Sequence, residues 1–244
     1  MKNLFLFLLF FASTPLFADI EKDIDKIEVP TEELETESVL PVFDKSEVIK
    51  VRNINTALRI EFGPSAGMSL NEPFYNPLVF GGVAAFNFNE VHGLNIQYLK
   101  FGDGLNSYGK QLKRGEGLNN STFDAGLAPH QESFTSLNYQ YAAYYGKISI
   151  TKFYIMNLTV YGMLGAGMVN DGEKSRPAIN IGIGQKLYFS KYIALRIDLD
   201  VYSYKGVDPA SVDLQANGIP KSSDQFAERN YFIPAIVGSL VFML

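Results

Sequence analysis

The chain contains no cysteine, so it can form neither disulfides nor thiolate metal sites. This absence excludes a small secreted fold held by disulfides, and also a bacterial lipoprotein anchor, which needs a cysteine at the cleavage site. The two histidines lie far apart, and no calcium-loop spacing is present among the acids of the polar segments, Asp103, Asp208, Asp213 and Asp224. GIGQK at 182–186 lacks the spacing and the Ser or Thr of a phosphate-binding loop. The sequence therefore predicts no metal and no cofactor.

Long apolar runs and strong charge are also missing. After the N-terminus, no run reaches the ~18 apolar residues of a membrane helix. The net charge is −5, which gives no case for a nucleic-acid partner. Hydrophobic residues make up 47% of the chain, an ordinary value that a membrane β-barrel shares because half of each strand faces a polar interior.

The N-terminal residues 1–18, MKNLFLFLLFFASTPLFA, have the layout of a secretory signal peptide. Lys2 supplies the positive charge, Leu4 to Phe11 form the apolar core, and cleavage is expected after about Ala18. The alternative is a transmembrane anchor, but the run is shorter than the ~17 apolar residues that a helix needs to span a bilayer. We expect an exported protein.

Residues 19–50 differ in composition from everything that follows. They carry eleven acidic residues against four lysines, which predicts a solvated acidic tail or linker. Ile20, Ile24 and Ile27 recur at helical spacing before Pro30, so a short docking or self-associating helix is the alternative.

The clearest pattern in the chain runs from Ile193 to Tyr204. Apolar Leu195, Ile197 and Leu199 alternate with charged side chains along IALRIDLDVYSY, so a strand here has one apolar and one charged face. The strand is about a dozen residues long, enough for a tilted strand to cross a bilayer, which needs about 9–11 residues. We expect the apolar face to meet lipid and the charged face to point inward.

The same period of two recurs throughout residues 51–244. It predicts eight strands, at 57–68, 78–88, 93–101, 136–146, 154–169, 178–189, 193–204 and 231–244. Connections after the odd-numbered strands are longer and more polar than those after the even-numbered ones, and aromatic residues gather near both strand ends. These features predict an all-β, eight-stranded antiparallel up-and-down transmembrane β-barrel of the outer membrane, with its acidic N-terminal tail in the periplasm.

The chain ends inside an apolar strand. Ile236, Leu240, Phe242 and Leu244 share one parity, much like the terminal signal that the outer-membrane barrel-assembly machinery reads, although that signal usually ends on the aromatic residue itself. The assembly machinery and outer-membrane lipids are therefore the expected partners.

Three segments carry a resemblance to a known family: VRNINTALRIEFGPSAGMSLNEPFYNP at 51–77, AYYGKIS at 143–149 and GMLGAGMV at 162–169. They resemble the outer-membrane β-barrel domain family of myxobacteria and related predatory or soil Gram-negative bacteria. The resemblance covers about Val48 to Leu244, and SLNEPFYNP is its most specific motif. It implies a small outer-membrane barrel without catalytic residues.

Charged residues on the inward parity form the candidate site. Strands one and seven both neighbour strand eight in a closed barrel, so their charges are expected to approach one another in the lumen. The predicted lumen charge network consists of Arg59, Glu61, Arg196, Asp198 and Asp200. Buried charges need partners, so we expect ion pairs that hold the barrel closed; a gated ion or proton path is the alternative.

Catalysis is not expected. Lipid-modifying enzymes on barrels of this size need a histidine with a nearby serine and an acid. His130, Glu132 and Ser133 lie close in sequence, but a histidine and serine three apart on a strand point to opposite faces, and the deacylase pattern spaces the pair by two.

Three functional hypotheses remain. The first is a structural, surface-binding or membrane-organising barrel that acts through its long loops at 102–134 and 205–228. The second is porin-like transport, through a narrow pore or as a subunit of a homo-oligomeric channel or lipid-enclosing assembly; Gly162, Ala166, Gln185 and Gly238 on the outer face would mark its seam. The third is a soluble lipocalin-like binder, which explains the aromatic rims and the apolar C-terminal end poorly.

Overall fold

The computed structural model describes residues 53–116, 121–151 and 154–244. The predicted signal peptide (1–18) and acidic tail (19–50) lie outside these residues. No helix of the described residues is long and apolar enough to cross a membrane. The strands are β1 Ile60–Ser69, β2 Leu78–Asn87, β3 His92–Phe101, β4 Ser133–Thr151, β5 Tyr154–Asn170, β6 Ser175–Tyr188, β7 Ile193–Val207 and β8 Glu228–Met243.

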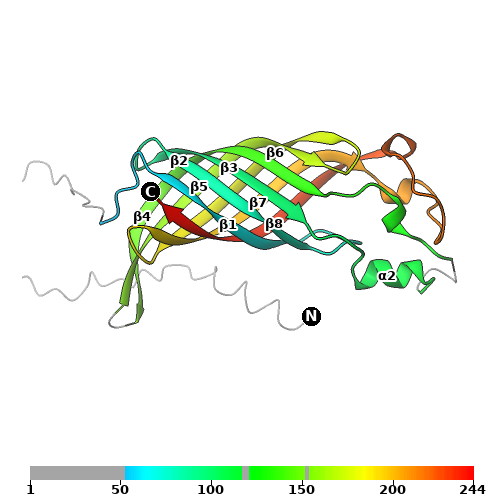
Figure 1. Ribbon diagram of the computed structural model, residues 1–244, viewed down its shortest axis with the longest axis horizontal. Coiled ribbons are helices and arrows are strands. Elements are labelled where there is room, and N and C mark those ends of the chain that lie inside the picture. The colour runs from blue at the N-terminus through cyan, green and yellow to red at the C-terminus, as the bar shows by residue number, and fades with distance from the viewer. Residues whose placement is uncertain (1–52, 117–120, 152–153) are drawn as a thin grey trace, which may run out of the picture. The chain divides into compact units, whose positions relative to one another are not determined.

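Each strand pairs antiparallel with the next, and β1 pairs with β8 to close the ring (Figure 1). At the closure Met68 lies opposite Ile236 and Phe62 opposite Phe242. The register skips Gly63 and Pro64, and Pro64 has no N–H to donate to the ladder. The predicted eight-stranded antiparallel up-and-down barrel is confirmed.

The polarity of the barrel is the reverse of that of a water-soluble domain. Large apolar side chains point outward, for example Ile179 (65% exposed) and Ile183 (62%) on β6. Polar side chains point into the lumen, where Asn95, Asn138 and Asn180 are fully buried. The alternation predicted for 193–204 is present, because its charged parity is buried and its apolar parity faces outward.

The two ends of the barrel differ in their connections. One end carries 70–77, 102–132, 171–174 and 208–227, and the other carries 88–91, the short β4–β5 link and 189–192. Figure 1 shows α2 (Ser107–Lys113) at the first end, which we call the loop end, and the C-terminus at the opposite end. The β5–β6 connection is shorter than predicted, because Ser175 and Arg176 already pair with β5.

The long 102–132 connection contains structure that its composition did not predict. Asn106 caps α2 by accepting a hydrogen bond from the Gly109 amide at 2.8 Å. Leu112 on α2 is buried. A hydrophobic cluster joins this connection to the end of β7 and the β7–β8 loop. It consists of Ala128, Val207, Leu214 and Phe226. The loops of this end therefore pack on each other.

Strand β4 runs further than predicted. Its residues after Tyr141 pair only with β5. A register shift between Ala142 and Tyr144 interrupts the alternation. In a regular strand Tyr144 would share the inward parity of Asn138 and Gln140. It is 56% exposed because of this shift. Figure 1 shows this part of β4 projecting, together with the start of β5, beyond the rest of the barrel.

Candidate functional site

The lumen contains two buried ion pairs. Lys186 on β6 contacts Glu61 on β1, with Nζ and Oε2 2.5 Å apart, and Asn87 donates to the other oxygen of Glu61 at 2.7 Å. Arg196 on β7 contacts Asp198 through Nε and Oδ2, also at 2.5 Å. All four charged side chains are 2% exposed or less. Each charge therefore has an opposite charge within hydrogen-bond distance, as burial requires.

Tyr161 on β5 lies between the two pairs. Its hydroxyl donates to Asp198, and its ring lies 5.1 Å from the Arg196 guanidinium and 5.3 Å from the Lys186 ammonium. Gly182 and Gly184 on β6 face Asp200 and Asp198 across the ladder. A Cβ at either glycine would lie within 3.0 Å of a carboxylate oxygen, so these glycines make room for the acids.

Four of the five predicted network residues lie in the lumen, and Arg59 does not. Arg59 precedes β1 at the end opposite the loops, where its Nη1 donates to the Lys191 carbonyl at 2.7 Å. The inward parity does not extend to it, because Leu58 has a left-handed φ of 57° and the regular ladder begins at Ile60. Asp200 accepts a bond from Gln97 at 3.3 Å.

Lys186 is the member that the sequence analysis missed. Its signal was available, because Lys186 shares the parity of Asn180, Gly182 and Gly184, all of which are buried. The alternating isoleucines of β6 mark only its outward parity, and Lys186 lies on the opposite, inward one.

Apolar layers close the lumen on both sides of the charges. Toward the loops, Phe134 and Tyr202 stack with ring centroids 4.5 Å apart, and both side chains are fully buried. They belong to a cluster with Val79, Leu99, Phe101, Val169, Ala178, Ile233, Ala235 and Val237. A smaller cluster, Ile54, Tyr188, Ala194 and Met243, lies at the opposite end. Side chains therefore fill the barrel along much of its length, as expected for eight strands.

A pocket of about 50 Å³ lies at the loop end, above the apolar layer. Its walls come from the β1–β2 connection, the residues before β4, the end of β7 and the start of β8. Tyr75 stacks on His130, with centroids 4.1 Å apart and an interplanar angle of 11°. Tyr204 stacks on Tyr231 at 5.4 Å. We call this space the mouth pocket.

Two carboxylates line the mouth pocket, and they differ in their partners. Asp171 is saturated, because it accepts bonds from Arg176 Nε at 2.7 Å and from the Lys174 amide at 2.7 Å. Glu72 has no hydrogen bond or ion pair with any described residue, and burial raises its pKa to about 7. Burial also raises the pKa of Tyr75, and the charges of Asp124 and Glu72 raise it further.

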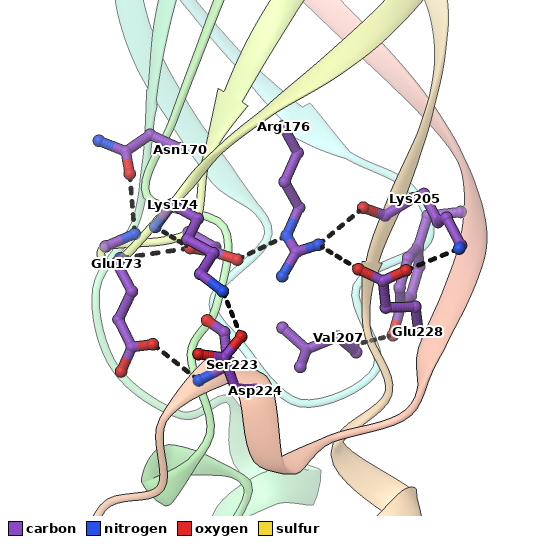
Figure 2. Close-up of polar contacts among 12 residues, drawn as sticks. Asn170, Glu173, Lys174, Arg176, Lys205, Val207, Ser223, Asp224 and Glu228 are labelled. Atoms are coloured by element: carbon purple, nitrogen blue, oxygen red, sulfur yellow. Dashed lines mark hydrogen bonds and ion pairs between the residues drawn. The ribbon is translucent and has the colours of Figure 1, made fainter.

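A polar network beside the pocket fastens the β5–β6 turn and the strand ends to the β7–β8 loop (Figure 2). Arg176 bridges Asp171 and Glu228, and Lys205 contacts Glu228 at 2.6 Å. Glu173 accepts a bond from the Ser223 amide at 2.7 Å, which lowers the pKa of Glu173. Lys174 pairs with Asp224. We call these contacts the loop latch; they hold the pocket walls in place.

Among the described residues, no three His, Asp or Glu side chains gather in a way that would hold a metal ion. His130 packs on Tyr75, and Ser133 is the first residue of β4. His92 lies at the opposite end beside Tyr139 and Tyr141.

No protein-family model and no curated protein sequence matches the chain. The N-terminal β-barrel domain of Pseudomonas aeruginosa OprF is similar in structure, with 13% identity and a TM-score of 0.41, over 77% of this chain and 98% of that one. Ail, the attachment invasion locus protein of Yersinia pestis, is similar with 12% identity and a TM-score of 0.33, over 76% and 97%. The resemblance to the myxobacterial family stays a prediction.

Proposed function

We propose that the chain is an integral outer-membrane β-barrel with a closed lumen, and that its role is surface binding or membrane organisation through the loop end. The observation that carries the proposal is the reversed polarity of the barrel. A belt of outward Ile, Leu and Phe would be unfavourable in water but is stabilised by contact with acyl chains. A membrane suits a closed barrel, because closure pairs the backbone groups of every strand edge.

The lumen supports a closed barrel rather than an open channel. The largest fully buried side chains are Arg196, Tyr161, Tyr202, Phe134 and Lys186, and they form two layers of the lumen, the charged one and the stacked aromatic pair. A water-filled path would leave the charges hydrated, whereas here two ion pairs are buried and Asp200 is 1% exposed with a bond from Gln97. The loops at the loop end are therefore the natural contact surface. No catalytic step is assigned to them.

Partners follow from the same features. Outer-membrane lipids cover the apolar belt, and the barrel-assembly machinery engages β8, whose outward parity ends in Phe242 and Leu244. One observation favours homo-oligomers: Pro64, Gly82 and Ala84 line an apolar groove on the outer wall, bordered by Phe62 and Tyr98. A second barrel bound in this groove would support the alternative function, transport by an oligomeric assembly. Measuring the mass of the particle in mild detergent would detect such an oligomer.

Cysteine labelling tests the sidedness, because the chain has no cysteine of its own. Ile181→Cys on the outward face of β6 should react with a lipid-soluble maleimide in membranes, and Asn180→Cys in the lumen should not. Asp213→Cys in the β7–β8 loop should react with an impermeant maleimide on intact cells. Labelling of Asn180→Cys in preference to Ile181→Cys would overturn the membrane assignment.

Planar-bilayer recording tests the closed lumen. The purified full-length chain, with folding verified by heat-modifiable gel migration, should give no steady conductance. Replacing the stacked pair, Phe134→Ala with Tyr202→Ala, should raise the conductance by removing part of the apolar layer. Porin-like conductance of the wild-type chain would refute the closed barrel and favour transport.

A further inference from the structure

We propose that the mouth pocket binds a small primary alkylammonium cation, with the Glu72 carboxylate as counter-ion and the tyrosine rings as walls. The inference does not depend on the membrane location, since it concerns the pocket alone.

The first argument is the unpartnered carboxylate. Glu72 lines the pocket in a half-buried position, and no described residue supplies a cation or a hydrogen-bond donor to it. The neighbouring cation, Arg176, is already held by Asp171 and Glu228. A buried carboxylate left without a partner is costly, so an arriving cation would gain what the protein does not provide.

The second argument is the orientation of the aromatic walls. The Tyr75 hydroxyl donates to the Ala125 carbonyl at 2.8 Å, and the Tyr231 hydroxyl donates to the Val207 carbonyl at 2.8 Å. These bonds tie the polar tips of both tyrosines to the loops, so the rings themselves line the space. Aromatic rings attract ammonium groups through their quadrupole while accommodating an attached hydrocarbon.

A third polar side chain lines the same pocket. Gln131 lines the pocket at 7% exposure, with its amide nitrogen donating to the Tyr202 hydroxyl at 2.7 Å. Its Oε1 is buried and has no hydrogen-bond partner among the described residues. The two oxygens of the Glu72 carboxylate can accept two of the three N–H bonds of a primary ammonium, and Gln131 adds a polar wall to the pocket.

Size and ligand count select this cation over others. A volume of about 50 Å³ holds an ammonium with the first carbons of its chain, since one water molecule occupies about 30 Å³ in the liquid. Calcium takes 6–8 oxygen ligands, which these residues do not supply. Anions would be repelled by Glu72 and Asp171.

The test is an NMR titration of the full-length chain in detergent micelles at pH 8, with n-butylammonium, 1-butanol, tetramethylammonium and calcium as separate probes. Butylammonium should shift the signals of the mouth-pocket residues saturably, and the other three probes should not. Glu72→Gln should weaken butylammonium binding about tenfold, and Tyr204→Leu about three- to fivefold.

Glu116→Gln is the matched control, because Glu116 is exposed beside Arg114 and does not line the pocket. It should bind butylammonium as the wild type does. Heat-modifiable migration verifies that each variant is folded. Equal binding of butanol and butylammonium, an unchanged affinity in Glu72→Gln, or saturable binding of calcium in place of the amine would overturn the proposal.

Discussion

Breaking the Glu61–Lys186 pair should destabilise the barrel far more than breaking an exposed pair. Lys186→Met removes a 2% exposed ammonium and leaves the Glu61 carboxylate with Asn87 as its remaining hydrogen-bond donor. Removing one partner of a buried ion pair costs about 3–5 kcal/mol, and the bond from Asn87 favours the lower end of that range. An unfolding free energy reduced by about 3 kcal/mol lowers the urea midpoint by roughly 1–3 M.

The assay is urea unfolding of the barrel in lipid vesicles, with the folded fraction read from unheated gel migration. Lys100→Met is the control, because Lys100 is 61% exposed and lies 4.0 Å from Asp103; it should change stability by less than about 1 kcal/mol. Adding Glu61→Gln to Lys186→Met neutralises the remaining charge and should recover most of the loss. A midpoint of Lys186→Met equal to that of Lys100→Met, or no recovery in the double variant, would refute the reasoning.

Two further predictions concern the lumen glycines and the mouth pocket. Gly184→Ala should destabilise the barrel by about 1–3 kcal/mol, because the new Cβ would meet Asp198 and Tyr161. Gly162→Ala is the control and should be tolerated, because a Cβ at Gly162 has no neighbour closer than 4.0 Å. Equal urea midpoints of the two variants would contradict this prediction. Glu72 should titrate near pH 7 in carboxyl ¹³C spectra, in a pocket that it shares with Tyr75, His130, Asp171, Tyr204 and Tyr231. Its raised pKa means that the folded state holds an extra proton between pH 4.5 and 7, so wild-type stability should fall across that window as pH rises, and Glu72→Gln should remove that part of the fall. A midpoint near 4.5 would refute it.

Periodicity was sufficient to predict the barrel because each strand carries its own sidedness. Asp198 and Asp200 were assigned to the lumen from alternation alone, and alternation needs no knowledge of the neighbouring strand. It fails where the backbone departs from the ladder. Arg59 lies beyond the start of β1, and the register shift after Ala142 turns Tyr144 outward. Neither departure has a residue signature as strong as the alternation itself.

The mouth pocket was beyond the reach of periodicity for a different reason. SLNEPFYNP stood out as a motif, but the burial of Glu72 depends on where the ends of β7 and β8 and the segment before β4 meet it. Helix α2 was missed in a segment rich in Gly and Asn, although Asn106 provides a capping signal. Convergence of distant loops is a tertiary property, so a single sequence does not predict it.

The acids of the lumen and of the loop end differ in how a ligand can reach them, and this difference points to the candidate site. In the lumen, Glu61 and Asp198 have cationic partners, and Asp200, which has none, is fully enclosed and accepts a bond from Gln97. At the loop end, the latch through Arg176 and Glu228 holds the walls of a pocket whose own carboxylate is left unpaired. Of these two acids without a cation, Asp200 is enclosed in the lumen, whereas Glu72 lines a pocket at the loop end, so Glu72 is the one that a cation from outside can reach. Local violations of this kind are expected at binding sites. The mouth pocket is therefore where a ligand should be sought.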